Sequence, residues 1–164
     1  MYNNFQYKSS YESLKEDLRN KIVLLDGAMG TMLQMENLTS EDFGGENYEG
    51  CNDYLVMTIP NIIKNIHKKY LESGSDIIET NTFGALDIVL KDYDLEDKTF
   101  ELNKNAAIIA NDAIKEYRKE NPNDKRNLYI AGALGPSNKS ISVTGGVTFD
   151  ELISLKSLLK ILQL

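Results

Sequence analysis

In the stretch Asp76-Ile77-Ile78-Glu79-Thr80-Asn81-Thr82, a short apolar run passes directly into polar residues. Two further runs behave alike: Ile22-Val23-Leu24-Leu25 leads into Asp26-Gly27, and Leu128-Tyr129-Ile130-Ala131 leads into a glycine-bearing turn. Short apolar runs of this kind are typical of parallel strands, and we expect the run over residues 22–25 to be buried on both of its faces. The polar strand ends should meet at one edge of the sheet, where parallel α/β folds gather their sites.

Helical patterns separate these runs. Apolar residues at helical spacing predict helices over residues 9–20, 62–71, 100–117 and 148–164. Gly74 stands where a glycine ends the second helix, and Pro122 lies just beyond the third. Residues 35–53 are polar and rich in turn residues, which indicates a long loop within one domain. Helix and strand therefore alternate, and the fold class is α/β.

Composition narrows the functional classes. The chain has 164 residues, of which 41% are hydrophobic, enough for a single domain with a core. Its net charge is −7 and no basic patch is present, so we expect a small-molecule partner, with no nucleic acid and no membrane surface. The single cysteine, Cys51, excludes an internal disulfide framework and fits the cytoplasm. Neither a signal peptide nor a membrane-spanning segment is recognisable.

The first strand end carries the clearest candidate site. Asp26 supplies a carboxylate for a ligand ammonium group, and the amides of Gly27 and Ala28 could face a ligand carboxylate, which together would suit an amino acid. Taken alone, an Asp-Gly pair more often makes a simple tight turn after a strand, and spacing does not exclude that interpretation. A third possibility is an unrelated barrel enzyme that uses Asp26 and Glu79 as acid and base.

The other strand ends leave similar alternatives open. Glu79, Asn81 and Thr82 could orient a polar ligand or could bond to neighbouring backbone. The Gly132-Ala133-Leu134-Gly135-Pro136 segment is expected to shape the wall of the pocket. His67 falls inside a predicted helix without a second histidine, and we expect it to be a packing or surface residue. Cys51 alone cannot make a zinc site.

Four ordered stretches resemble the homocysteine-binding domain of the cobalamin-dependent methionine synthases. They are Leu25-Asp26-Gly27-Ala28-Met29-Gly30-Thr31-Met32-Leu33-Gln34, Gly50-Cys51-Asn52-Asp53-Tyr54-Leu55, Asp76-Ile77-Ile78-Glu79-Thr80-Asn81-Thr82-Phe83 and Gly132-Ala133-Leu134-Gly135-Pro136-Ser137-Asn138-Lys139. The resemblance extends over residues 18–152 and is looser to the betaine-homocysteine methyltransferases.

This resemblance implies an incomplete (β/α)8 TIM barrel, made of the first three to four βα units and an N-terminal helix. It also implies a homocysteine S-methyltransferase in which zinc holds the substrate thiol as a thiolate and methylcobalamin donates the methyl group. The substrate-binding residues that it implies are Asp26, Gly27, Ala28, Glu79, Asn81, Thr82, Phe83 and Gly135.

The family's three zinc cysteines have no counterpart in this sequence. A complete barrel needs roughly 250 residues. We therefore expect residues 1–164 to be one domain, the N-terminal part of a barrel, with a divergent truncated helix at residues 153–164. Such a chain should be inactive alone. It would depend on a cobalamin-binding domain or protein, or, as a non-catalytic half-barrel, on a complementary half-barrel that carries the zinc cysteines.

Overall fold

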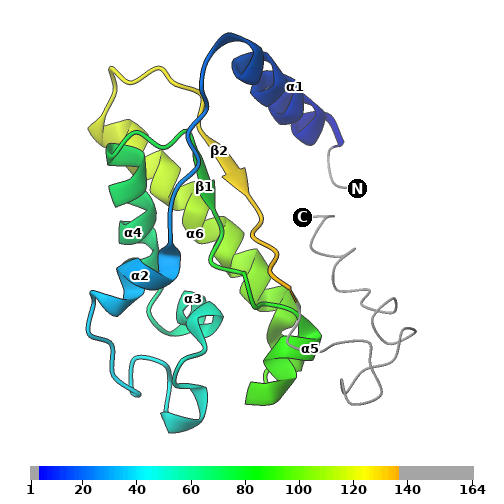
Figure 1. Ribbon diagram of the computed structural model, residues 1–164, viewed down its shortest axis with the longest axis vertical. Helices are drawn as coiled ribbons and strands as arrows, with labels where there is room; N and C mark the ends of the chain where they lie inside the picture. Colours follow the sequence, from blue (N-terminus) through cyan, green and yellow to red (C-terminus); the bar gives the residue numbers. More distant parts are fainter. Residues whose placement is uncertain (1–3, 137–164) are drawn as a thin grey trace.

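The computed structural model describes residues 4–136, and Figure 1 shows how their helices and strands are arranged. In chain order these are α1 (Asn4–Asn20), α2 (Met29–Gln34), the short 3-10 helices η1 (Glu46–Tyr48) and η2 (Asn52–Tyr54), α3 (Leu55–Thr58), α4 (Pro60–Glu72), β1 (Ile77–Glu79), α5 (Asp87–Leu90), the 3-10 helices η3 (Lys91–Tyr93) and η4 (Glu96–Lys98), α6 (Thr99–Glu120) and β2 (Tyr129–Ala131). The helix predicted over residues 148–164, with its divergent part at 153–164, lies outside the described residues.

The sheet is parallel and its centre is β1. On one side β1 pairs with β2, Ile78 lying opposite Ile130. On the other side Leu25 forms a single parallel bridge with Ile77. Because α6 connects β1 to β2, the two strands and this helix make a βαβ unit, which confirms the α/β class predicted from the alternation of patterns.

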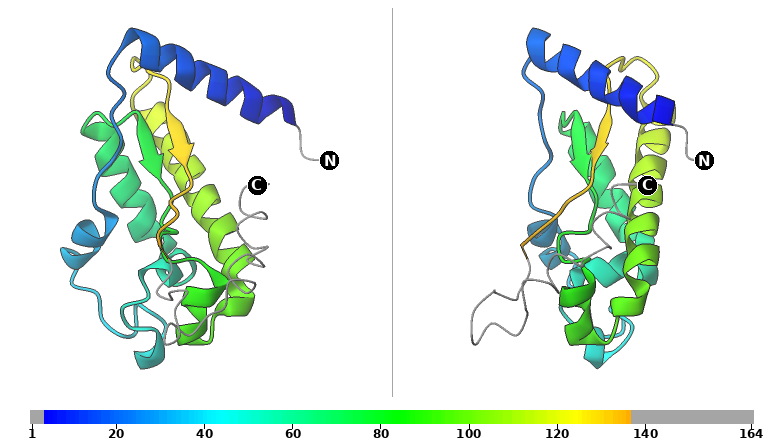
Figure 2. Two further views of the ribbon diagram at one scale, coloured as in Figure 1. Left: turned by 45° about the vertical axis from the view of Figure 1, so that its right-hand side comes forward. Right: turned by 90° about the vertical axis from the view of Figure 1, so that its right-hand side faces the viewer.

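Two long helices cover one face of this sheet. Ile78 is fully buried in a cluster with Leu71 of α4 and with Ala110 and Tyr117 of α6. Figure 2 shows α4 and α6 running beside the strands, whereas α1 extends away across one end of the molecule. The described part of the chain thus has a layer of strands with helices on a single side.

The ends of the helices follow the local signals in the sequence. α4 begins with a proline at its first position, where the missing amide costs nothing. Gly74 follows its last turn with a φ of +108°, a conformation that glycine adopts without strain. α6 ends at Glu120, shortly before Pro122. These boundaries confirm the helices predicted over residues 62–71 and 100–117.

The first strand departs from the prediction of burial on both faces. Residues 22–25 make only the single bridge at Leu25, and the exposed fractions of Ile22 and Leu25 are 85% and 52%. A strand is buried on both faces only where a layer of structure lies on each side of it. In the described residues α4 and α6 supply one such layer, so the apolar side chains of this segment remain in contact with solvent.

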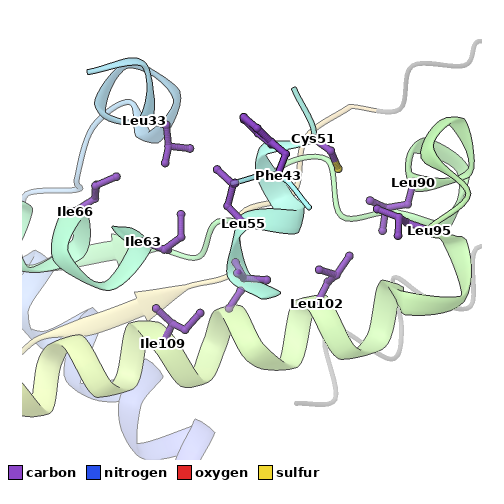
Figure 3. Packing of buried hydrophobic residues seen from close by; sticks show 12 residues of the cluster. Leu33, Phe43, Cys51, Leu55, Ile63, Ile66, Leu90, Leu95, Leu102 and Ile109 are labelled. Carbon is purple, nitrogen blue, oxygen red and sulfur yellow. The ribbon is translucent and has the colours of Figure 1, made fainter. Parts of the chain in front are cut away.

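The main core lies below the strand ends, between the predicted loop and the two long helices. Leu55, Ile63 and Leu102 are fully buried there (Figure 3). Phe43 and Cys51, both from the loop over residues 35–53, pack against the same cluster. The long loop is therefore held by its own apolar side chains and forms a wall of the domain.

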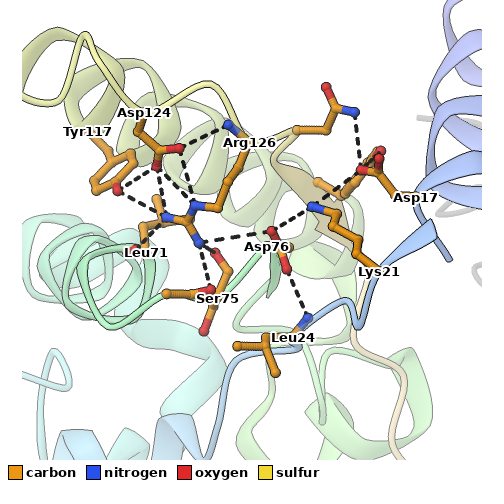
Figure 4. A network of polar contacts seen from close by, with 12 residues as sticks. Asp17, Lys21, Leu24, Leu71, Ser75, Asp76, Tyr117, Asp124 and Arg126 are labelled. Atoms are coloured by element: carbon orange, nitrogen blue, oxygen red, sulfur yellow. Dashed lines mark hydrogen bonds and ion pairs between the residues drawn. The ribbon is translucent and has the colours of Figure 1, made fainter.

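A polar network closes the opposite end of the sheet, where the strands begin (Figure 4). The guanidinium of Arg126 donates to the backbone oxygens of Gly74, at 2.6 Å, and Leu71, at 3.1 Å, so it satisfies carbonyls at the end of α4. The same group donates to the Asp124 carboxylate at 2.8 Å and to the Tyr117 hydroxyl at 3.0 Å. One side chain thereby joins α4, α6 and the segment before β2.

Asp76 extends this network to residues 21–25, the first segment after α1. Its carboxylate is buried and accepts from the Leu24 amide at 3.0 Å and from the Lys21 ammonium at 3.1 Å. Asp17 of α1 accepts in turn from the Tyr129 hydroxyl at 2.8 Å. These contacts attach α1 and the first segment to the sheet. No helix within residues 4–136 is both long enough and apolar enough to cross a membrane.

Candidate functional site

The polar strand ends meet around one cavity, as the sequence predicts. Both strands point toward the end of the molecule that carries α2, α3 and α5 (Figure 1). The cavity there has a volume of about 560 Å³. Its lining residues are Asp26, Gly27, Ala28, Met29, Gly30, Gly50, Asn52, Asp53, Glu79, Thr80, Asn81, Phe83, Gly84 and Ala133. Six of the eight predicted substrate-binding residues are among them; Thr82 and Gly135 lie beside the cavity.

One carboxylate oxygen of Asp26 makes a structural hydrogen bond, and the other has no partner. Its Oδ2 atom accepts from the Glu79 amide at 3.0 Å, which continues the backbone pairing that Leu25 begins with β1. Its Oδ1 atom is buried and has no hydrogen-bond partner in the structure. Burial raises the pKa of this carboxyl to about 6, and the charge of Glu79 acts in the same direction. Asp26 is therefore ionised at neutral pH but close to its titration point.

The turn after Asp26 needs small residues because Tyr70 of α4 lies against it. A Cβ atom at Gly27 would lie 3.1 Å from the Tyr70 hydroxyl oxygen, closer than ordinary van der Waals contact. The same hydroxyl donates to the Ala28 carbonyl oxygen at 3.3 Å. Tyr70 thus holds the turn in place, and Gly27 makes room for it.

The side chains of Asn81 and Thr82 form hydrogen bonds to neighbouring backbone, one of the two roles that the sequence left open for them. The Asn81 side-chain nitrogen donates to the Asn52 carbonyl oxygen at 2.7 Å. The Thr82 hydroxyl donates to the Ala133 carbonyl oxygen at 2.8 Å and also lies 2.7 Å from the Thr80 hydroxyl. Both side chains are almost fully buried. They connect the ends of β1 and β2 with the loop before α3.

Gly135 matters because it has no side chain, which fits the wall-shaping role expected for this glycine-bearing turn. Its amide donates to the Phe83 carbonyl oxygen at 2.9 Å, and an added Cβ atom would stand only 2.5 Å from that oxygen. Phe83 itself remains 63% exposed at the rim of the cavity. Any larger residue at position 135 would push the two strand ends apart.

Sequence reasoning missed the contribution of the loop before α3. Asn52 and Asp53 line the cavity, and the Asp53 carboxylate accepts from the Gly84 amide at 2.9 Å. Burial raises the pKa of Asp53. The signal was present in the Gly50-Cys51-Asn52-Asp53-Tyr54-Leu55 stretch, which carried part of the family resemblance without suggesting a role for its polar residues.

Cys51 and His67, whose side-chain types often bind metal ions, both lie in the interior. Cys51 is 3% exposed and packs in the main apolar cluster (Figure 3). His67 of α4 is fully buried, which agrees with the packing role expected for it. Among residues 4–136 no three or more histidine, cysteine or acidic side chains are grouped to hold a metal ion.

Comparison with known proteins adds a family and a structural relative. A family model described as homocysteine S-methyltransferase matches residues 23–157. Two crystal structures of the homocysteine methyltransferase MmuM from Escherichia coli are similar to this chain at 26% identity. The oxidized form has a TM-score of 0.63 and the metallated form 0.62, each over 75% of this chain. The match spans 40% and 41% of the MmuM chain, about two fifths of its length.

Proposed function

Because the chain belongs to the homocysteine S-methyltransferase family, we propose that it supplies the homocysteine-binding part of a methionine synthase type enzyme. That enzyme would transfer a methyl group to the homocysteine thiol and give methionine. The observation that carries the proposal is the buried, unpaired Oδ1 atom of Asp26, a residue that lines the cavity. A carboxylate oxygen without a donor favours a cationic partner. The ammonium group of an amino acid is such a partner.

The neighbouring backbone completes an amino-acid site. Within the described residues, neither the Gly27 amide nor the Ala28 amide donates a hydrogen bond, so both are available to a carboxylate. Asp26 would then bind the ammonium group of homocysteine, and the turn after it would bind the carboxylate. Glu79 and Phe83 line the same cavity and would contact the rest of the substrate.

The described residues do not fit the zinc ion that the family resemblance implies. Cys51 is the single cysteine of the sequence. It is buried in the core, and among residues 4–136 no three histidine, cysteine or acidic side chains are grouped to hold a metal ion. We propose that zinc ligands come from outside residues 4–136 and that these residues contribute substrate binding.

Two finer proposals follow from the motif resemblance. One is that methylcobalamin, held on a cobalamin-binding domain or protein, is the methyl donor. The other is that this chain alone does not turn over, since it holds one cysteine where the family uses three. Purified chain, supplied with zinc and methylcobalamin, should give no methionine above background. Turnover by the isolated chain at the rate of a complete enzyme would contradict this proposal.

Binding of homocysteine should depend on the ionised form of Asp26. Since the pKa of its carboxyl is raised to about 6 by burial, lowering the pH below that value neutralises the group. We expect a dissociation constant of roughly millimolar at neutral pH, which weakens about tenfold for each pH unit below 6. Titration calorimetry between pH 5 and pH 7.5 measures this profile.

The Asp26→Asn variant is the direct test of the site. It keeps the size of the side chain and an oxygen for the Glu79 amide but removes the charge, so binding should weaken about tenfold or more at pH 7. Asp97→Asn, at an exposed position on η4, is the matched control and should bind as the unchanged chain does. Equal affinity in the Asp26 and Asp97 variants would refute the assignment.

The second candidate is a half-barrel that assembles with a separately encoded chain. Exposed apolar side chains on the first segment and on β2 favour it, with Leu25 at 52% and Ile130 at 39% exposure. A downstream reading frame with its own start should then encode the complementary strands and the zinc cysteines, and the two purified products should sediment as a 1:1 complex. Ile130→Lys, a charge on the β2 strand, should prevent assembly. Products that sediment separately would exclude this candidate.

A further inference from the structure

The loop before α3 and the turn after β1 hold each other through reciprocal contacts. Asn81, in the turn, donates its side-chain amide to the backbone oxygen of Asn52, 29 residues earlier, at 2.7 Å. Asp53, in the loop, accepts from the backbone amide of Gly84, 31 residues later, at 2.9 Å. Each segment thus supplies one side chain that binds the backbone of the other. Two contacts of opposite direction fix both the separation and the register of the segments.

We propose that Asp53 and Asn81 form a clamp that fixes residues 50–53 as a wall of the homocysteine cavity. Both are positioning residues, and neither binds the substrate. The inference rests on the proposed function for the identity of the ligand, but the clamp itself is defined by contacts within the chain. It assigns a role to Asp53 and replaces the role of substrate ligand that the family resemblance implies for Asn81.

Burial argues that Asn81 is committed to this contact. The residue is 7% exposed, and one N–H of its side-chain amide is used by the Asn52 carbonyl oxygen, which fixes the direction of the amide. A ligand that pulled this amide away would leave the Asn52 carbonyl oxygen without its donor. The contact with Asn52 is therefore kept when a ligand enters.

Gly84 shows how closely Asp53 is fitted. A Cβ atom at this position would lie 2.7 Å from the Asp53 Oδ2 atom, whereas the next nearest atoms are 3.6 Å away. Gly84 does not have a positive φ, so its backbone conformation is open to other residues. The glycine is thus required by the carboxylate that packs against it. Gly84→Ala should displace Asp53 and leave the turn itself unstrained.

Hydrogen exchange tests the clamp without any ligand. The Cys51 amide bonds to the Tyr48 carbonyl oxygen and the Gly84 amide bonds to Asp53, so both amides report on opening of the wall. Asn81→Leu, which removes the donor at similar size, and Gly84→Ala should each speed exchange at these amides about tenfold. Asp53→Asn, which keeps the acceptor oxygen for Gly84, should stay within about twofold of the unchanged chain. Unchanged exchange in Asn81→Leu and Gly84→Ala would overturn the clamp.

Homocysteine calorimetry on the same variants separates positioning from ligation. Asn81→Leu and Gly84→Ala should weaken binding about tenfold, whereas Asp53→Asn, which loses only the charge, should bind almost unchanged. Weakened binding in Asp53→Asn would make Asp53 a ligand of the ammonium group and overturn the proposal. In the Asp53→Ala background, adding Gly84→Ala should have no further effect, because the methyl group acts through Asp53; additive losses would also overturn it.

These outcomes distinguish the clamp from the proposed function. If Asp26→Asn weakens binding but the clamp variants do not, the function stands and the clamp is wrong. If the unchanged chain does not bind homocysteine at all, the proposed function fails, and the exchange experiment still decides whether Asp53 and Asn81 fix the wall.

Discussion

Arg126→Ala is expected to lower the free energy of unfolding by about 3 kcal/mol. Its guanidinium donates to the backbone oxygens of Leu71 and Gly74 and to the side chains of Asp124 and Tyr117. Hydrogen bonds to charged groups are worth about 1.5 to 3 kcal/mol each, but those of one network are not additive. Arg126 also holds the pKa of the Asp124 carboxyl well below its usual range. Urea unfolding at pH 7 measures the loss.

A surface arginine provides the control for this variant. Arg19 of α1 forms an ion pair with Glu16 in which both side chains are 66% exposed. Exposed pairs contribute about 0 to 1 kcal/mol, so Arg19→Ala should change the stability by no more than about 0.5 kcal/mol. Arg126→Lys keeps the charge but cannot reach four acceptors, and it should be intermediate. If Arg126→Ala and Arg19→Ala have equal effects, the network does not stabilise the fold.

The second large effect is a loss of stability in acid that comes from His67. The side chain is fully buried, and neither ring nitrogen has a hydrogen-bond partner. Burial lowers its pKa from 6.5 to about 4. The unfolded chain therefore takes up a proton on this imidazole at a higher pH than the folded chain does. Above pH 6.5 the imidazole is neutral in both states and costs no stability. As the pH falls from 6.5 to 4, the free energy of unfolding decreases. The shift corresponds to about 3 kcal/mol.

His67→Leu should remove this dependence, since leucine fills a similar volume and no hydrogen bond is lost. Asp26 complicates the comparison because its raised pKa makes the fold more stable as the pH falls from 6 to 3.8. The unfolding free energies should therefore be measured from pH 4 to pH 7 in an Asp26→Asn background. With His67 present the stability should fall toward pH 4, and with leucine it should stay flatter. Parallel profiles would mean that His67 is not the source.

The long helices could be predicted because their signals are local. Apolar residues at helical spacing define α4, and Pro60 and Gly74 mark its ends. The short helices α2 and α3 span only six and four residues, too few for a periodic pattern to emerge. Exposure of residues 22–25 could not be predicted either. Hydrophobicity tells which side chains can be buried, but the layer that covers them is supplied by distant parts of the chain.

Of the candidate site, some residues could be located from the sequence, whereas the contacts between distant segments could not. Asp26 and Glu79 could be located from strand ends, because parallel strands bring their carboxyl ends to one edge. The partner of Asn81 could not, since an amide can bond to a ligand or to backbone and the sequence pattern is the same for both. Only the folded chain brings Asn52 within 2.7 Å of it.

The position of Asp26 links ligand binding to the attachment of the first segment. Its backbone amide donates to Ile77 and its side chain accepts from Glu79, so the residue that offers a free oxygen also continues the pairing along β1. An amino acid held by Asp26 would resist detachment of residues 21–28 from the sheet edge. At ten times its dissociation constant, such a ligand adds about 1.4 kcal/mol to the stability of the folded chain. The segment that is joined to β1 by a single bridge would thus be reinforced by a bound amino acid.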